Sequence, residues 1–565
     1  MRESVTRIYQ SFVWRGENSA LASDLYGNPP VTLGDVIARR GSLIQKYRSH
    51  RLSSEDRTSK LAGVLITLNR VLGVLTPEVR KSIEGLWGGA VEAAHQSVCL
   101  GGSTYILNKA ATAHRIASIA GEDEQKLSAF FFVADYDQVQ PELTNIRTPL
   151  LGPEGNLISM PVPTGYENSP VSVVPLASFD WYAQVEENIR SGYRPLFKSV
   201  HDASRAVFEE RLEHALSICR SAFVRSETLG EWAQRIIGHL LNIDGRLGVP
   251  LLPASDSHLR PLFLEGLEFL LTGDNLNLFI EEHQRATDTI LQSGLDPGGG
   301  VREQDYVPFF YECPGSECHQ SRVELRHAST GLLKGKCPQC HQTVEIEFNE
   351  KAPDLSEHSQ HLSPRVDTRQ ILVDTLLPVL CHVGGPGEAA YYSQVIPSAR
   401  RLGLPFPMFV KYPRVYFNTP WNESLALKLK ERGFPVLHSP EVFRLSGQVA
   451  RARKSNKMTD MNAALENLEQ AILGPRKEIM SRLSQMPKSR EQADGEDAQK
   501  VRFDLECYLS WAYGGYAEEK LGQEASWSWI EWMLNTGPSD LFGPYERAYV
   551  GGMKNGATLF VNFVA

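Results

Sequence analysis

Four cysteines have the residue type and spacing of a metal site. Cys313 and Cys318 form one pair, Cys337 and Cys340 form the second, and each pair lies in a turn that contains proline. The segments between and after the pairs are strand-like. This layout is typical of a zinc ribbon, in which two turns present four thiolates to one tetrahedral ion. Because four thiolates close the coordination shell, the sequence predicts a structural Zn²⁺ site over residues 301–350.

A second candidate site lies in a glycine-rich turn. An apolar run over 376–383 precedes Gly384, Gly385 and Gly387, and a helix-like segment opens at Glu388. A buried strand, a glycine turn and a helix N-terminus can together hold an anion or a nucleotide. The turn has neither the Lys-Ser or Lys-Thr of a Walker motif nor the glycine spacing of a dinucleotide fingerprint. A tight structural turn without a ligand is the alternative.

Alternating helix and strand patterns are expected to position these residues. A helix is predicted over 103–119, and the apolar run 129–133 predicts a buried strand that ends at Asp135 and Asp137. Such alternation favours an open, largely parallel sheet with ligands at the carboxyl ends of its strands. The predicted fold class is therefore α/β.

Composition and charge narrow the class of protein. The 67 acidic and 58 basic side chains give a formal net charge of −9, which argues against a broad nucleic-acid-binding surface. No run approaches the roughly 18 apolar residues that a membrane helix needs, and the first residues lack the apolar core of a signal peptide. The expected location is the cytoplasm, where clustered cysteines bind metal more often than they form disulfides.

A heptad-like apolar seam marks the helical region over 445–523. Met461, Leu465, Leu468 and Ile472 lie on one predicted helix face. The seam indicates a helical hairpin that either pairs with a second copy of the chain, as a homodimer, or packs within one chain.

A long, ordered set of motif residues runs from 361 to 415. The set consists of Ser363, Pro364, Val366, Arg369, residues 383–388, Tyr391, residues 403–407 and Arg414. In this order the residues resemble the cysteine-adding enzyme family of bacillithiol biosynthesis, BshC. A weaker upstream match consists of His95, Gln96, Gly101, Gly102, Tyr105, Lys109 and residues 135–137. The resemblance covers roughly 90–445, with the ribbon inside it as an insertion.

The resemblance implies a fold and a reaction. The family's core is similar to the Rossmann-like catalytic domain of class I aminoacyl-tRNA synthetases, and the family ends in a helical coil that dimerises. Its reaction joins cysteine to a glucosaminyl-malate acceptor through an amide bond. Because a free carboxylate must be activated for this step, the resemblance implies a carbon–nitrogen ligase that uses ATP, with Mg²⁺ as a second cofactor.

The resemblance also implies roles for individual residues. The implied catalytic residues are Lys109, Asp135, Asp137, Arg369 and His382. The implied cofactor-binding residues are Gly101, Gly102, Tyr105, Gly384, Gly385, Gly387, Glu388, Tyr391 and Arg414. Cationic side chains would clamp phosphate charge, the two aspartates would bind an amine or a magnesium ion, and the histidine would orient a group or transfer a proton.

Each of these roles has a structural alternative. The cations can be paired at the surface, the aspartates can cap a turn, and the histidine and tyrosines can be packing residues. The chain also departs from the family, because Tyr136 replaces a histidine and His95 replaces a glutamine. A ligase with another acceptor, and a non-catalytic scaffold that binds protein or RNA through its ribbon and coil, are therefore the competing hypotheses.

The predicted organisation has six segments. They are an N-terminal helical segment over 1–90, the first part of a Rossmann-like core over 91–300, the zinc ribbon over 301–350, the second part of the core with the glycine turn over 351–444, the helical hairpin or coiled coil over 445–523, and a C-terminal segment over 524–565.

Overall fold

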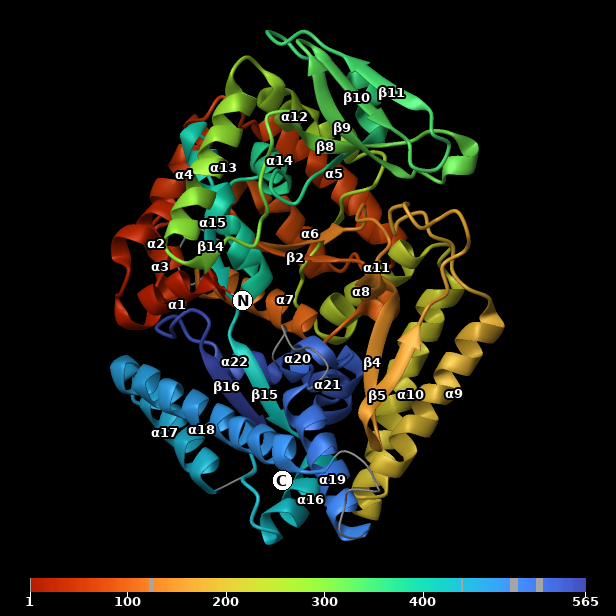
Figure 1. The fold of residues 1–565 in the computed structure, drawn as a ribbon, viewed down its shortest axis with the longest axis vertical. Coiled ribbons are helices and arrows are strands. Elements are labelled where there is room, and N and C mark those ends of the chain that lie inside the picture. The colour runs from red at the N-terminus through yellow and green to blue at the C-terminus, as the bar shows by residue number, and fades with distance from the viewer. Residues whose placement is uncertain (1, 121–126, 438–439, 488–495, 515–521, 565) are drawn as a thin grey trace.

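The computed structural model describes residues 2–120, 127–437, 440–487, 496–514 and 522–564 (Figure 1). Its central sheet has five strands, and every neighbouring pair is parallel. In spatial order the strands are β14 (Met408–Lys411), β13 (Val379–Gly384), β2 (Ala90–Gln96), β3 (Ser128–Ala134) and β6 (Leu251–Pro253). The predicted α/β class with a parallel sheet is confirmed.

The strand order creates one switch point in the sheet. Of the strands in this sheet, β2 comes first along the chain. It pairs on one side with β3, the second of them, and on the other with β13, the fourth. Connections leave this point in opposite directions, so a crevice opens beyond the carboxyl ends of β2 and β13. The glycine turn follows β13 directly, and the acidic segment 135–137 follows β3.

Helices cover both faces of the sheet. On one face α7 (Tyr105–Ala120) packs against β2, β3 and β13. On the other face α5 (Glu55–Val71) and α6 (Pro77–Glu84) bury Leu61, Leu65 and Ile83 beside Phe130 and Phe132 of β3. Strands buried on both faces explain the continuous apolar runs of the sequence.

The remaining helices frame this core. Ahead of α5 lie α1 (Thr6–Arg15), α2 (Ser19–Tyr26), α3 (Leu33–Ala38) and α4 (Arg40–Ser49), so the first 90 residues are mainly helical as predicted. Later helices are α8 (Pro141–Thr144), α9 (Phe179–Phe197), α10 (Asp202–Val224), α11 (Leu229–His239), α12 (Leu264–Leu271), α13 (Asn275–Gln292), α14 (Arg369–Leu376), α15 (Pro386–Arg401) and α16 (Pro420–Glu431). The hairpin β4 (Asn145–Leu150) with β5 (Gly152–Ser159) lies beside α9 (Figure 1), and β1 (Glu3–Ser4) pairs with β7 (Leu295–Asp296).

The ribbon forms a second, antiparallel sheet at one end of the molecule (Figure 1). Its strands, in spatial order, are β11 (Thr343–Glu347), β10 (Leu332–Lys336), β9 (Arg322–Ser329), β8 (Tyr306–Glu312) and β12 (Leu362–Pro364). The two cysteine turns connect β8 to β9 and β10 to β11. At Gly315 a Cβ would lie 2.9 Å from the Cys318 sulfur, so only glycine fits this approach.

The C-terminal helices bury the heptad-like seam within the chain. The helices are α17 (Pro440–Lys454), α18 (Met458–Gln485) and α19 (Glu496–Tyr513), and α18 continues through Pro475. Met461, Leu465 and Ile472 are at most 1% exposed in the single chain. Of the two alternatives for the seam, the structure has intramolecular packing, and the links 488–495 and 515–521 of the predicted hairpin lie outside the described residues.

The last segment adds α20 (Gln523–Ser526), α21 (Trp529–Thr536), α22 (Gly543–Ala548) and β16 (Thr558–Asn562). β16 pairs in parallel with β15 (Arg414–Asn418), which follows the edge strand of the central sheet. Lys554 Nζ donates to the Trp14 carbonyl at 2.7 Å, and the Asn555 side chain donates to the Pro30 carbonyl. The segment therefore binds both the core and the N-terminal helices.

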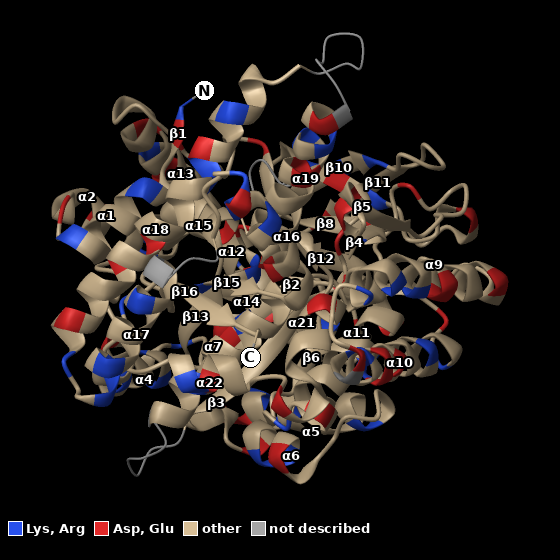
Figure 2. Ribbon diagram, turned by 90° about the horizontal axis from the view of Figure 1, so that it is seen from below, with Lys and Arg blue, Asp and Glu red and all other residues tan. Residues whose placement is uncertain are grey.

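Surface charge along two long helices and the apolar length of the helices bear on the sequence expectations. Along α9 and α10, Lys and Arg lie beside Asp and Glu, and no single-sign stripe follows these helices (Figure 2). None of the helices in the described ranges is both long and apolar enough to cross a membrane.

Two buried carboxyl groups will make the protein less stable at alkaline pH. Burial raises the pKa of Glu531 to about 8 and that of Glu524 to about 7. Because both values exceed the ordinary glutamate value of 4.5, the stability they contribute is full below that value and is lost as the pH rises to 7 for Glu524 and to 8 for Glu531. We expect the midpoint temperature of thermal unfolding to fall from about pH 5 to about pH 8 and to level off above it. Glu531→Gln should flatten this slope by up to about 1.4 kcal/mol per pH unit, whereas the exposed control Glu546→Gln should not; equal slopes for both variants would refute the prediction.

Candidate active site

The glycine turn holds a carboxylate of the chain itself. The helix α15 begins at Pro386, and Gly385 donates its backbone N–H to Glu388 Oε2 at 2.6 Å. Glu388 Oε1 accepts from Lys109 Nζ at 2.8 Å and lies 3.6 Å from His382 Nε2. Although burial alone would raise the pKa of Glu388, Lys109 and His382 bring it well below the ordinary glutamate value. The anion bound at this helix N-terminus is therefore Glu388.

The three glycines of the turn have different surroundings. A Cβ on Gly384 would lie 2.7 Å from the Phe409 ring, and one on Gly385 would lie 3.2 Å from the Tyr412 ring. Gly387 is exposed, and no atom lies within 4 Å of a Cβ built there. Packing thus explains two of the glycines, and open space for a ligand remains only at the third.

Lys109 connects the turn to the neighbouring strand. Its Nζ also donates to the Ala94 carbonyl of β2 at 3.0 Å, and its side chain is 4% exposed. The predicted phosphate clamp is thus part of a buried ion pair, and a phosphate at this point would compete with Glu388.

Below the turn lies a buried charged network. Glu92 of β2 and His382 of β13 are register partners on adjacent strands, with their side chains 3.5 Å apart. Arg369, at the start of α14, forms an ion pair with Glu92, and its guanidinium lies 4.7 Å from the centre of the Phe132 ring. Burial raises the pKa of Glu92, but Arg369 and His382 outweigh it and bring the pKa to about 2. Glu92 and Arg369 are therefore both charged across the physiological range.

The two predicted acids after β3 have different surroundings. Asp135 is 2% exposed, and its oxygens accept from the Gln234 side chain at 2.8 Å and from the Ser255 backbone and hydroxyl. Burial raises its pKa to about 6. Asp137 instead accepts from Gln96 Nε2 at 2.9 Å and lies 3.7 Å from Arg322 Nη1. Asp135 therefore connects β3 to the loop after β6, and Asp137 lies nearer the crevice.

A cavity of about 340 Å³ opens beside the carboxyl end of β2. Its lining includes His95, Gln96, Ser103, Tyr105, Glu142 and Arg147. Within it His95 Nε2 and the Tyr105 hydroxyl share a hydrogen bond. The Tyr105 ring also stacks on that of Tyr412, with centres 6.4 Å apart, so the cavity wall continues to the glycine turn. Hydrogen-bond donors and acceptors thus lie together at the switch point, where α/β proteins bind ligands.

The other predicted residues lie around this cavity. Tyr391 neighbours the network through Tyr392, whose ring is tilted against its own with centres 5.1 Å apart. Gly101 and Gly102 have φ of +75° and +84°, and a Cβ on Gly101 would lie 2.5 Å from Ile236, so these glycines serve a packed turn. Arg414 begins β15 and donates its backbone N–H to Ala557, away from the charged network.

Sequence reasoning missed three residues that the structure brings to this region. Glu92 is the only acid within the buried strand AVEAAHQ, and a lone charge at such a position was the signal that could have found it. Gln96 matched the family but was not assigned to the site. Arg322 gave no local signal, because its neighbour Asp137 lies 185 positions earlier in the chain.

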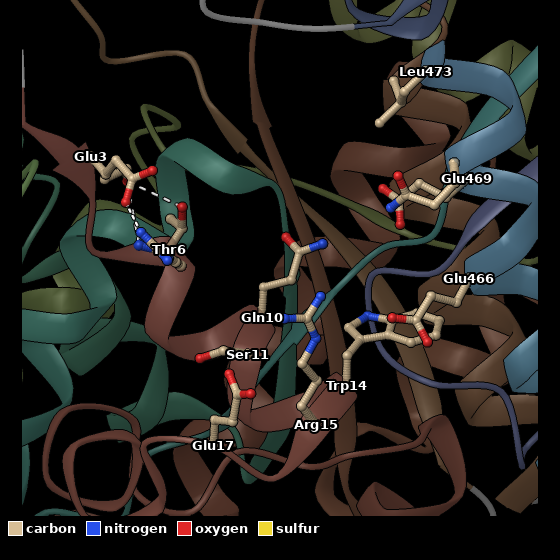
Figure 3. A pocket seen from close by; sticks show the side chains of 13 residues that line it. Glu3, Thr6, Gln10, Ser11, Trp14, Arg15, Glu17, Glu466, Glu469 and Leu473 are labelled. Atoms are coloured by element: carbon tan, nitrogen blue, oxygen red, sulfur yellow. Dashed lines mark hydrogen bonds and ion pairs between the residues drawn. The ribbon is translucent and has the colours of Figure 1, made fainter.

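A larger hollow of about 580 Å³ lies elsewhere, between α1 and α18 (Figure 3). Gln10, Trp14 and Arg15 line one side, and Glu466 and Glu469 line the other. It contacts the central sheet through Lys411 Nζ, which donates to Gln10 at 3.2 Å at the edge strand β14. The smaller cavity is the candidate active site, because that one lies at the switch point and adjoins the buried ionisable network.

The ribbon cysteines form a complete metal-binding set. Their four sulfurs all lie within 4.8 Å of one another, with Cys313 to Cys340 at 3.9 Å and Cys318 to Cys337 at 3.8 Å. A tetrahedral ion with sulfurs at about 2.3 Å requires sulfur–sulfur distances of about 3.8 Å. The four residues are therefore close enough together to hold one metal ion.

Comparisons with known proteins find similarity to one family. The profile of the N-terminal Rossmann-like domain of bacillithiol-biosynthesis BshC matches residues 184–415. Three proteins named "Putative cysteine ligase BshC" are similar to this chain. The one from Chloroherpeton thalassium is 32% identical over 126 residues, which are 22% of this chain and 20% of the relative. The one from Christiangramia forsetii is 24% identical over 224 residues (39% of this chain, 38% of the relative), and the one from Oceanobacillus iheyensis is 22% identical over 341 residues (58% of this chain, 55% of the relative).

These alignments span less than two thirds of each relative, from 20% to 55% of its length. The profile match nevertheless includes β13, the glycine turn, α14 and the whole ribbon sheet. Over residues 184–415 the chain is therefore similar to the Rossmann-like domain of BshC, and the four ribbon cysteines lie within that range.

Proposed function

We propose that the chain is a ligase that joins cysteine, or another amino acid, to a small polar amino-sugar acceptor through an amide bond. The observation that carries the proposal is the cavity of about 340 Å³ at the switch point, bordered by a buried network of ionisable groups. The name of the relatives supports cysteine as the amino acid. The substrates are small molecules, and the volume suits an amino acid beside a sugar ring.

Several side chains of the cavity suit substrate binding. Glu142 can pair with a substrate ammonium and Arg147 with a substrate carboxylate, since both line the cavity. The hydrogen-bonded pair of His95 and Tyr105 can accept the proton that an amine loses when it forms an amide. The ion pairs of Lys109 with Glu388 and of Arg369 with Glu92 hold the floor of the site rigid.

The proposal includes ATP, with Mg²⁺, as the cosubstrate. ATP supplies the activation that amide formation from a free carboxylate needs. The exposed start of α15 at Pro386 and Gly387 has room for a phosphate, which would lie beside the Glu388 carboxylate already bound by the Gly385 N–H. Asp137 is the acid best placed to bind a magnesium ion or an amine, because both oxygens of Asp135 already accept hydrogen bonds within the protein.

For the ribbon we propose Zn²⁺ in a structural role. The four thiolates match the sulfur spacing and leave no open coordination position for a substrate. The proposed location is the cytoplasm, where the sulfurs stay reduced and available to the ion.

Incubation of the purified protein with ATP, Mg²⁺, cysteine and a glucosaminyl-malate acceptor tests the proposal. We expect mass spectrometry to detect a product heavier than the acceptor by one cysteine residue, with stoichiometric ATP cleavage. Replacement of His95 with phenylalanine should lower kcat at least about ten-fold, because it removes a proton acceptor. The exposed control Lys60→Met should leave kcat unchanged. A metal-loaded protein that neither binds ATP in calorimetry nor forms the product would refute the ligase assignment.

A further inference from the structure

One cation of the ribbon lies close to the candidate active site. Arg322, the first residue of β9, has a side chain that is 9% exposed and a guanidinium 4.0 Å from the centre of the Phe310 ring. Its Nη1 lies 3.7 Å from Asp137 Oδ1, and its buried Nε has no hydrogen-bond partner among the described residues. A buried guanidinium with so few partners is costly, which indicates a function for its position.

The cysteine turn fixes where Arg322 lies. Ser321, immediately before it, donates its backbone N–H to Cys318 at 2.8 Å and accepts from the Cys313 N–H at 3.0 Å. Arg322 itself donates its backbone N–H to Asn168 at 2.9 Å. A metal that holds the two cysteines together therefore also holds the start of β9 against the loop that follows the β4–β5 hairpin.

From Arg322 a chain of contacts leads into the cavity. Asp137 lies between Arg322 and Gln96, whose Nε2 donates to Asp137 Oδ2 at 2.9 Å, and Gln96 lines the cavity. A charged carboxylate can only accept hydrogen bonds, so it selects the nitrogen end of the amide. Gln96 Oε1, to which no described residue donates, is left as an acceptor for a ligand.

We propose that the metal-held ribbon sets ligand specificity. Arg322 is a positioning residue that holds Asp137. Gln96 is the specificity-determining residue, and it accepts a hydrogen bond from an N–H or O–H group of the ligand. The ligand classes that fit are an amino-acid ammonium and the amine or hydroxyl groups of an amino sugar. The identity of these ligands rests on the proposed function, whereas the coupling of the ribbon to Gln96 does not.

The protonation state of Asp137 gives the coupling a measurable signature. Burial raises the pKa of Asp137, and Arg322 and Gln96 oppose that rise. The other groups that face it are Arg369 of α14 and Glu142 of α8, together with the adjacent Tyr136. Without Arg322 the carboxyl will take up a proton at a higher pH and become a donor, and the orientation of Gln96 will be lost.

Calorimetric titration with L-cysteine and, separately, with D-glucosamine tests this assignment in the full-length, metal-loaded protein. We expect Arg322→Gln to lower the affinity for one of the two probes roughly ten-fold near neutral pH, which corresponds to the loss of about one hydrogen bond. Part of the lost affinity should return at higher pH. Arg322→Lys, which keeps the charge, should retain most of the affinity, and Gln96→Met should weaken the same probe at every pH. The probe that responds distinguishes the ammonium from the sugar groups.

Arg326→Gln is the matched control, because Arg326 lies on the same strand but is 44% exposed and pairs with Asp305 and Glu303 at the surface. Native mass spectrometry should find the metal retained in all four variants. Unchanged affinity and pH dependence in Arg322→Gln would overturn the proposal.

Hydrogen exchange provides a test that needs no ligand or activity. Chelation of the metal and Arg322→Gln should both increase amide exchange in the segment 134–142 after β3, and Arg326→Gln should not. If chelation leaves that segment unchanged, the ribbon is not coupled to the site and the proposal fails. If neither probe binds the wild-type protein but the exchange responds, the proposed function fails while the coupling stands.

Discussion

Replacing Cys337 and Cys340 with serine will abolish metal binding and unfold the ribbon sheet. The two residues supply half of a ligand set whose sulfurs already have tetrahedral spacing. Structural zinc contributes about 10–16 kcal/mol of apparent binding free energy in isolated zinc-finger peptides, and this energy is folding energy. We expect native mass spectrometry to find one metal ion per wild-type chain and none in the variant, with lost exchange protection in β8 to β11.

The matched control is the pair Cys219→Ala and Cys507→Ala. Both cysteines are buried but lie outside the ribbon, so this variant should lose some stability and keep its metal. Stoichiometric metal in the serine variant would show that the ion binds elsewhere.

Removal of one partner of the buried pair Glu92 and Arg369 will be strongly destabilising. Both side chains are at most 6% exposed, so Glu92→Gln leaves an arginine charge without its partner in the core. Breaking such a pair costs about 3–5 kcal/mol, whereas replacing both members with apolar residues of similar volume is often close to neutral. We expect urea unfolding to give the double variant, Glu92→Leu with Arg369→Met, a higher free energy of unfolding than either single variant.

The exposed pair of Lys60 and Asp56 provides the comparison for this experiment. Its side chains are 63% and 72% exposed, and Lys60→Met should change the free energy of unfolding by no more than about 1 kcal/mol. A double variant less stable than both singles would show that the pair stabilises the core directly.

Local patterns were sufficient to predict the main elements of the fold. The apolar run that became β3, the cysteine spacing of the ribbon and the glycine turn before α15 all lie in short stretches of sequence. The Thr228 side chain accepts from the Glu231 backbone N–H and so caps the start of α11. In each case the residues that determine the structure are close neighbours in the chain.

The site was harder to predict because its contacts are distant in sequence. Glu92 meets Arg369 across 277 positions, and Lys109 meets Glu388 across 279. A motif can name Lys109 and Arg369 but does not show that carboxylates of the same chain already neutralise them. The seam of α18 raised a similar difficulty, since periodicity shows an apolar face and does not reveal what covers it.

The contacts between the two ends of the sequence have a consequence for biosynthesis. Lys554 and Asn555 bind residues that leave the ribosome more than 500 positions earlier, and β16 is the only described partner of β15. The N-terminal helices and β15 must therefore wait, with apolar faces uncovered, until β16 has been synthesised. Protein expressed at lower temperature or with additional chaperones should accordingly give a larger fraction of folded molecules, and a deletion of β16 should accumulate as aggregate.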